Sequence, residues 1–268
     1  MIDLIKSLNI NYAFERSIKM FEKTLIGNRF MYGIHKKEIK QAPHDTLLDL
    51  CRRINMPEDF YEVVRKNLQD VEVTGWAIEE MDKSTTCKMY LDFMDKWKRE
   101  VKATSAERNP FLLYLGFKWD AMDNTKRGRA RYTWYPSLPF ESILERLANI
   151  LDRDVHQDLF EAAKGLLEAA LRRVAYHDIV YVEVTEENSP RKSFDMNLYG
   201  AKLLLKQVYP FLQRIYRHYS IPDEEFHAMY NPHRSLKFGH LSGGIDRRGK
   251  DFATLYFGAG DITKPKQT

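Results

Sequence analysis

The stretch TTCKMYLDF, residues 85–93, alternates between apolar and polar side chains with a period of two. One face of the predicted strand consists of Cys87, Met89, Leu91 and Phe93. The other face carries a lysine, a phenol and a carboxylate in a row: Lys88, Tyr90 and Asp92. The apolar face predicts burial in a core. The polar row either faces bulk water, as in an ordinary solvent-facing strand, or lines an enclosed space, and this choice decides the fold.

Composition limits the possible folds. The chain has 268 residues, of which 44% are hydrophobic and 13% aromatic, which is enough for one large α+β domain. The formal net charge of +4 is small for a nucleic-acid binder, and the two cysteines cannot form a disulfide framework. We expect a cytoplasmic protein, because no apolar run approaches the length of a membrane span and the first residues lack the pattern of a signal peptide.

Four predicted hairpins alternate with amphipathic helices along the chain. The pairs of strands comprise residues 71–78 with 85–93, 111–119 with 129–135, 179–185 with 192–199, and 236–242 with 252–258. Helices are expected over 11–25, from Pro57 onward, and over 140–151, 156–173, 202–219 and 222–229. Residues 27–37 read as a short strand, and 94–110 as a short charged segment. We expect a single domain over 1–268, with a helical part over 1–70, barrel hairpins and helices over 71–258, and a polar tail over 259–268.

The polar faces of these strands favour a closed barrel over an open sheet. They comprise Lys88, Tyr90 and Asp92; Tyr114 and Lys118; Arg129, Arg131, Thr133 and Tyr135; Tyr181, Glu183 and Thr185; Asp195, Asn197 and Tyr199; Lys237; and Thr254 and Tyr256. Nearly every strand contributes a tyrosine, which suits a wet and partly apolar pocket better than a solvated surface. The pattern therefore predicts an α+β fold: an antiparallel β-barrel surrounded by α-helices.

Cations that converge in such a space need a counterion. Each loses solvation worth on the order of several kcal/mol, and the cations repel one another. Water or a polyanion between the charges makes the cluster tolerable. A diphosphate fits, because Lys and Arg supply charge-assisted hydrogen bonds and tyrosine hydroxyls supply neutral ones.

The αββα order, with KMY at 88–90 and RARYTWY at 129–135, resembles the aromatic prenyltransferases of the ABBA, or PT-barrel, fold. In that family ten antiparallel strands surround a lumen, and basic-x-Tyr or Arg-x-Lys-x-Tyr patterns bind an isoprenyl diphosphate. Lys88 with Tyr90 matches the first pattern, whereas Arg129, Arg131 and Tyr135 match the second with Thr133 in place of a tyrosine. The resemblance covers about residues 70–258. The sequence departs from the family pattern in two respects. It shows four hairpins rather than five, and it has only the short segment 94–110 where the family places helices.

The resemblance implies transfer of a dimethylallyl or geranyl group from its diphosphate to an electron-rich aromatic acceptor. The implied diphosphate-binding residues are Lys88, Tyr90, Lys118, Arg129, Arg131, Tyr135, Tyr199, Lys237 and Tyr256. The implied acceptor pocket contains Tyr114, Tyr181 and Asn197. Glu183 is the preferred proton acceptor because it shares a face with Tyr181, and Asp92 and Asp195 are the rivals.

No DDxxD motif is present, so we expect no required cofactor, although Asp92 or Asp195 could hold one Mg²⁺ ion. We expect a monomer whose partners are the two small-molecule substrates, with no membrane and no nucleic acid. Two other functions stay open. The barrel could bind a hydrophobic or anionic metabolite without reacting, or an open aromatic face could bind single-stranded nucleic acid.

Overall fold

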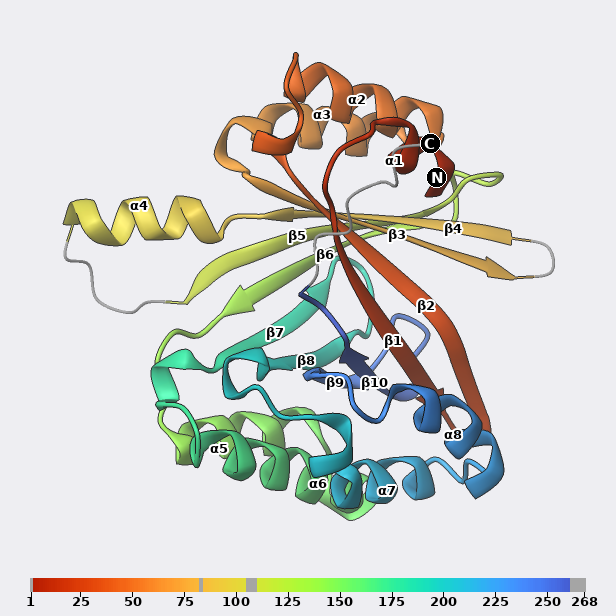
Figure 1. The fold of residues 1–268 in the computed structure, drawn as a ribbon, viewed down its shortest axis with the longest axis vertical. Helices are drawn as coiled ribbons and strands as arrows, with labels where there is room; N and C mark the ends of the chain where they lie inside the picture. The colour runs from red at the N-terminus through yellow and green to blue at the C-terminus, as the bar shows by residue number, and fades with distance from the viewer. Residues whose placement is uncertain (1, 82–83, 105–109, 261–268) are drawn as a thin grey trace.

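Ten antiparallel strands close into one barrel in the computed structural model, which describes residues 2–81, 84–104 and 110–260 (Figure 1). Around the barrel the strands follow the order β1-β10-β9-β8-β7-β6-β5-β4-β3-β2. The strands are β1 Ala13–Phe21, β2 Thr24–His35, β3 Val73–Met81, β4 Ser84–Asp92, β5 Phe111–Asp120, β6 Arg127–Trp134, β7 Val180–Glu186, β8 Lys192–Asn197, β9 Phe238–Ile245 and β10 Asp251–Phe257. The predicted α+β barrel is confirmed.

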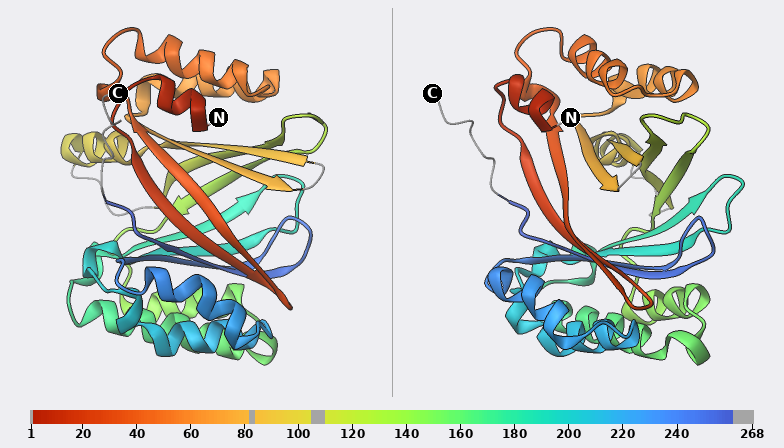
Figure 2. Two further views of the ribbon diagram at one scale, coloured as in Figure 1. Left: turned by 45° about the vertical axis from the view of Figure 1, so that its right-hand side comes forward. Right: turned by 90° about the vertical axis from the view of Figure 1, so that its right-hand side faces the viewer.

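Helices cover the barrel on two opposite sides, as Figures 1 and 2 show: α1 to α3 on one side and α5 to α8 on the other. The helices are α1 Ile2–Ser7, α2 Pro43–Arg53, α3 Glu58–Asn67, α4 Met94–Thr104, α5 Phe140–Ile150, α6 Arg153–Leu171, α7 Tyr209–His218 and α8 Asp223–Tyr230. Short 3₁₀ turns occur at Lys36–Glu38, Leu68–Asp70, Tyr176–Asp178, Tyr199–Ala201, Leu205–Gln207 and Asn231–His233. Helix α4 lies instead at the end of the barrel where β4 finishes.

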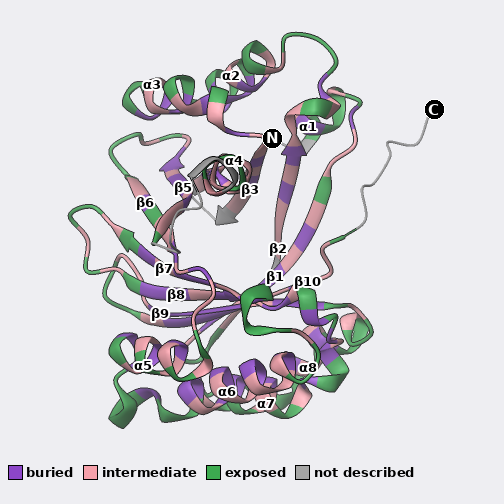
Figure 3. Cartoon of the chain, turned by 90° about the vertical axis from the view of Figure 1, so that its left-hand side faces the viewer, coloured by how far each residue is buried: buried purple, intermediate pink, exposed green. Residues whose placement is uncertain are grey.

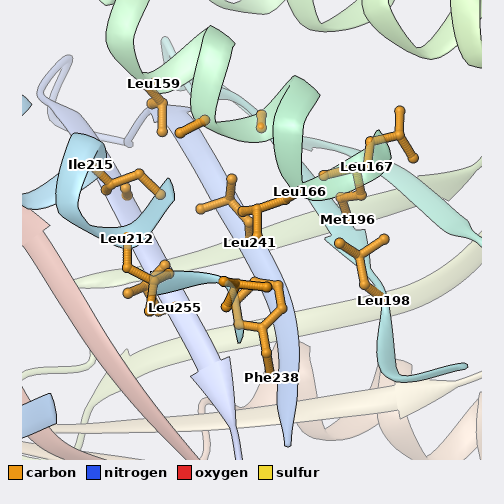
Figure 4. Close-up of a cluster of buried hydrophobic side chains, with 14 of the residues drawn as sticks. Leu159, Leu166, Leu167, Met196, Leu198, Leu212, Ile215, Phe238, Leu241 and Leu255 are labelled. Carbon is orange, nitrogen blue, oxygen red and sulfur yellow. The ribbon is translucent and has the colours of Figure 1, made fainter. Parts of the chain in front are cut away.

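Apolar side chains on the outer face of the barrel hold the helices in place. Burial alternates along the strands, and the buried stripes of the helices face the sheet (Figure 3). Leu166 of α6 and Leu212 of α7 pack in one cluster with Leu241 and Leu255 of the sheet, and all four are almost completely buried (Figure 4). Each such side chain contributes about 1.5–3 kcal/mol by burial. This packing leaves the other face of the strands to surround the interior of the barrel.

The N-terminal part of the chain supplies the fifth hairpin, β1 with β2. The prediction of a helix over 11–25 was therefore wrong, and the part over 1–70 that was expected to be helical contains this hairpin as well as α1 to α3. β1 alternates as a strand does, with Ile18 and Met20 buried on the outer face. Its register shifts between Ser17 and Lys19. The polar side chains that β1 turns into the barrel resemble the solvent face of a helix in sequence, which explains the error.

Two further segments differ from the predictions. Residues 94–104 form helix α4, because the Asp92 carboxylate accepts a hydrogen bond from the Met94 backbone N–H at 2.7 Å and stabilises the first turn. The helix expected over 202–219 begins only at Tyr209. Leu204 instead pairs with Lys237 as an isolated β-bridge, and Pro210 occupies the first turn of α7. The rest of the predicted tail, 261–268, lies outside the described residues.

None of the helices in the described ranges combines the length and the apolar character that crossing a bilayer requires.

Candidate active site

The row Lys88, Tyr90 and Asp92 faces the interior of the barrel. All three side chains line a cavity of about 300 Å³. A second cavity of about 100 Å³ shares Arg29, Lys88 and four other lining residues with the first. The strand that opened the sequence analysis therefore turns its polar face toward an enclosed space.

Six cations gather around the smaller cavity, and we call them the cationic end: Lys19, Arg29, Lys88, Lys118, Arg191 and Arg247. They come from β1, β2, β4 and β5, from the position directly before β8, and from the β9–β10 turn. Four carboxylates lie among them: Glu79, Glu186, Asp195 and Asp246. Positive groups thus outnumber negative ones in this part of the barrel.

Glu79 holds three of the cations together. It forms a short hydrogen-bonded ion pair with Lys88, accepts a hydrogen bond from Arg29 Nη2 at 2.6 Å, and lies 3.8 Å from Lys118 Nζ. Burial raises the pKa of Glu79, but the three cations outweigh this effect and hold its pKa far below the ordinary value. Burial lowers the pKa of Lys88 well below its ordinary value, and Glu79 opposes this shift in part.

Part of the positive charge has no partner. The Nη1 atom of Arg29 is buried and makes no hydrogen bond within the described chain. Burial, with Arg29 and Lys118 nearby, lowers the pKa of Lys19 to about 7. A buried donor without an acceptor is costly, so Arg29 Nη1 marks a place where an anion would bind, next to the Lys19 ammonium.

A layer of phenol rings follows the cations along the barrel. Tyr90, Tyr132 and Tyr256 line both cavities, and the rings of Tyr90 and Tyr132 meet edge to face at 5.9 Å. Small residues leave room for them: a Cβ atom on Gly116 would lie 3.0 Å from the Tyr132 ring and 3.1 Å from the Tyr90 ring. Aromatic rings therefore form half of the six residues that line both cavities, beside Arg29, Lys88 and Asp195.

Three carboxylates, Glu15, Asp92 and Asp195, line the larger cavity, and we call them the carboxylate end; Asp195 also lines the smaller cavity. His240 donates its Nδ1–H to the Asp195 carboxylate at 2.8 Å, and its Nε2 lies 3.8 Å from Glu15. Burial alone would lower the pKa of His240, but the two carboxylates raise it to about 9. The imidazole is therefore an imidazolium at neutral pH, and it neutralises part of the charge of this end.

Glu15 is the most enclosed of these carboxylates, with 8% of its side chain exposed. It accepts a hydrogen bond from the Tyr199 hydroxyl at 2.8 Å, and that hydroxyl accepts one from the Ala259 N–H at 3.0 Å. Burial raises the pKa of Glu15, although His240 and Tyr199 lower it in part. A fixed carboxylate with a raised pKa suits a proton acceptor.

Many of the predicted site residues do meet in this interior. The structure places nine of them on the cavity walls: Lys88, Tyr90, Asp92, Tyr114, Lys118, Asp195, Asn197, Tyr199 and Tyr256. They come from β4, β5, β8 and β10 and from the turn after β8. The alternation of these strands was therefore assigned to the correct faces.

The predicted face of β6 was wrong. Arg129, Arg131, Thr133 and Tyr135 point away from the interior, and the cavity face carries Gly128, Ala130 and Tyr132 instead. Arg129 is bonded to Glu187 at 2.7 Å on the outside, and Arg131 is exposed. The error arose because a glycine and an alanine on the inner face resemble a core-facing pattern, whereas a row of arginines is typical of a face that binds an anion.

Three more predicted site residues lie outside the cavity. Glu183 forms an ion pair with Arg146 of α5 at 2.7 Å, and this arginine stacks 3.6 Å above the ring of Tyr135. Tyr181 is completely buried in the core between the sheet and the helices. Lys237 is exposed in the bridge that precedes β9. β7 instead turns Val182 and Glu186 inward, so the preference for Glu183 as proton acceptor was wrong.

Among the site residues that sequence reasoning missed are Glu15, Lys19, Arg29, Glu79, Tyr132, Arg191, His240 and Arg247. Three of them belong to the hairpin that was read as a helix and a short strand. The spacing of Glu15, Ser17 and Lys19 was the available signal, because it places three polar side chains on one face of a strand.

Comparison with solved structures identifies the fold. No protein-family profile and no curated protein matches the chain. The 5-dimethylallyltryptophan synthase from Streptomyces coelicolor is similar with a TM-score of 0.60 at 11% identity, over 95% of this chain and 82% of that one. The 6-dimethylallyltryptophan synthase from Micromonospora olivasterospora, in complex with DMASPP and Trp, gives 0.58 at 11% identity, over 91% and 81%.

A third solved structure agrees with these two. The prenyltransferase PriB, in a ternary complex with L-tryptophan and dimethylallyl thiolodiphosphate, gives a TM-score of 0.59 at 10% identity, over 95% of this chain and 82% of that one. Likeness at such identities shows shared architecture rather than shared substrates. The chain therefore has the PT-barrel fold of the aromatic prenyltransferases, as the sequence resemblance implied.

Proposed function

We propose that this protein transfers a prenyl group from an allylic diphosphate to an electron-rich aromatic acceptor. The observation that carries the proposal is the distribution of charge inside the barrel: six cations surround the smaller cavity, Glu15 and Asp92 line only the larger one, and three tyrosine rings line both. The PT-barrel fold supports the same assignment by analogy. Each part of the interior has a task in this reaction.

The cationic end would bind the diphosphate and stabilise it as a leaving group. When the allylic C–O bond breaks, negative charge builds up on the diphosphate oxygens, and fixed cations lower the energy of that state. Arg29 Nη1 has no hydrogen-bond acceptor among the described residues and can donate, and Lys88 and Lys118 are held in place by Glu79. We propose that side-chain cations alone suffice for this task, so that Mg²⁺ is not required.

The tyrosine layer would shield the allylic cation that remains. The faces of Tyr90, Tyr132 and Tyr256 attract a cation and exclude water from it. Their hydroxyls are poor nucleophiles, because burial raises the pKa of Tyr90 and Tyr256 well above the ordinary value. The cation then persists until the acceptor ring reacts with it.

Proton transfer would complete the reaction at the carboxylate end. The acceptor ring attacks the allylic carbon, a new bond forms, and the ring loses one proton to restore its aromaticity. We assign Glu15 as the proton acceptor, because it lies inside the barrel and is fixed by Tyr199 and His240. Asp92 is the last residue of β4, at the mouth of the barrel, and is less suited to reach the ring.

Two other functions have less support. A protein that only binds an anionic metabolite would use the cationic end but would have no need for a buried carboxylate facing it. Nucleic-acid binding requires an open face, whereas Lys88, Lys118 and Tyr90 lie inside the closed barrel.

The proposal predicts turnover by the purified protein. Dimethylallyl and geranyl diphosphate, each supplied with indole or phenol acceptors, should give a product heavier than the acceptor by one prenyl group less one hydrogen, measured by mass spectrometry. The product should form equally with Mg²⁺ and with a chelator, because the cations of the barrel bind the diphosphate. Absence of any prenylated product across the panel would reject the proposal.

Replacing a lysine of the cationic end should slow the reaction. We expect Lys88→Ala to lower kcat/KM for the diphosphate by about 100-fold or more, since one donor to the leaving group is lost. The matched control is Arg131→Ala, which removes an exposed cation from the outer face of β6 and should leave kcat/KM within about twofold. Equal effects of the two substitutions would remove Lys88 from the site.

The proton acceptor can be tested in the same way. Glu15→Gln keeps the size of the side chain but cannot accept the proton, and it should lower kcat by about 100-fold to 10,000-fold. Glu183→Gln changes a carboxylate that is paired with Arg146 outside the barrel, and it should leave kcat nearly unchanged. A loss of activity in Glu183→Gln with full activity in Glu15→Gln would contradict the assignment.

Binding of inorganic diphosphate should weaken at high pH. Below pH 7 Lys19 is already protonated and attracts the anion, whereas above its pKa of about 7 a proton must be taken up on binding. Titration calorimetry between pH 6 and 9 should show affinity falling above pH 7, by up to about tenfold per pH unit. Lys19→Met should flatten this dependence, and because the ligand's own titration is common to both proteins, identical slopes would refute the role of Lys19.

A further inference from the structure

The charge of the carboxylate end limits which acceptor can bind there. Glu15, Asp92 and Asp195 lie near the phenol of Tyr114, and burial together with these three carboxylates raises the pKa of that phenol. His240 is the one imidazolium among them and lies closest to Asp195. In the described lining of this cavity the remaining cations are Arg29 and Lys88, and both are bound to Glu79. This end of the cavity is therefore negative.

Asp92 differs from the other two carboxylates in having no cation or hydroxyl bonded to it among the described residues. Glu15 accepts from Tyr199, and Asp195 is bonded to His240. Asp92 Oδ1 accepts a hydrogen bond from the Met94 backbone N–H, and through this bond Asp92 caps the N-terminus of α4. Burial raises the pKa of Asp92 to about 6, so the carboxylate is ionised at neutral pH. The cap uses only one oxygen of the Asp92 carboxylate. Its negative charge lies at the wall of the cavity and has no ion-pair partner among the described residues.

We infer that the acceptor carries an ammonium group and no free carboxylate, and that Asp92 binds the ammonium group as a specificity-determining residue. The inference rests on the proposed function, which supplies the aromatic ring of the acceptor. Asp92 lies at the end of β4, so an ammonium group on a short side chain would reach it while the ring lies deeper, beside Glu15. The ligand class is an aromatic ring with an aminoethyl substituent.

Repulsion excludes the alternative. A free carboxylate on the same side chain would meet Asp92 and Glu15, with no Arg or Lys of the described carboxylate end to compensate it. Selectivity that comes from an unfavourable charge contact is as effective as an added attraction. Amino acids should therefore bind more weakly than the corresponding amines, although both have the ammonium group.

Three indoles of nearly equal size test this inference by calorimetry with the intact protein. Tryptamine has the ammonium group, tryptophol has a neutral hydroxyl in its place, and tryptophan has the ammonium group and a carboxylate. We expect tryptamine to bind at least about tenfold more tightly than either of the others. Asp92→Asn should weaken tryptamine binding by about tenfold and change tryptophol binding by less than about twofold.

The variant is designed to preserve the fold. The amide oxygen that Asp92→Asn introduces can still accept from the Met94 N–H, so the cap of α4 stays while the charge is lost. Asp95→Asn is the matched control, because Asp95 lies on α4 and is paired with Lys98 at 3.0 Å outside the cavity. It should leave the binding of all three ligands unchanged. If Asp92→Asn does not fold, the ranking of the three ligands on the unaltered protein decides.

Several results would overturn the inference: tryptophan binding as tightly as tryptamine, equal loss of tryptophol and tryptamine binding in Asp92→Asn, or no binding of any of the three. Turnover with dimethylallyl diphosphate is measured separately. The expected ranking without turnover would uphold the inference about the ligand and reject prenyl transfer. Turnover of tryptophan as fast as tryptamine would uphold prenyl transfer and reject the ammonium group as a requirement.

Discussion

The charge separation inside this barrel depends on one spacing. At each of three strands a cation and a carboxylate lie four residues apart, and the period of a strand places both on the inner face. The pairs are Lys19 with Glu15 on β1, Lys88 with Asp92 on β4, and Arg191, directly before β8, with Asp195 on that strand. Four residues correspond to about 13 Å along a strand. On β1 the carboxylate precedes the cation along the chain, whereas on β4 and β8 the cation comes first. Because β4 and β8 also run in the opposite direction to β1, the three cations lie toward one end of the barrel and the three carboxylates toward the other.

Glu79 makes the cationic end compatible with a folded protein. Three buried cations without a counterion would cost on the order of several kcal/mol each, whereas one carboxylate in contact with all three lowers this cost and orients them. A second carboxylate in contact with the same cations would neutralise the site and leave little attraction for a diphosphate. Within the described part of the chain Arg29 Nη1 has no acceptor, so the arrangement stops short of full compensation.

The sequence predicted the barrel because its outer faces are apolar in a strict period of two on β4, β5 and β8. It failed on β6 and β7, where the inner residues Gly128, Ala130 and Val182 look like core positions and the outer residues Arg131 and Glu183 look like site positions. A helix that covers a sheet with arginine, as α5 does with Arg146, makes the outer face as polar as the inner one. When both faces of a strand carry polar residues, the alternation along that strand does not show which face lies inside the barrel. The packing of the helices against the outer face decides it.

Charge at both ends distinguishes an enzyme from a binding protein of the same shape. A barrel that merely held an anion would gain nothing from Glu15, whose burial at 8% exposure costs solvation and is offset only in part by Tyr199 and His240. A reaction that expels an anion at one end and a proton at the other needs both groups, and it needs them far enough apart not to neutralise each other. The reaction also needs a surface that stabilises the transient allylic cation, and the tyrosine rings provide that surface.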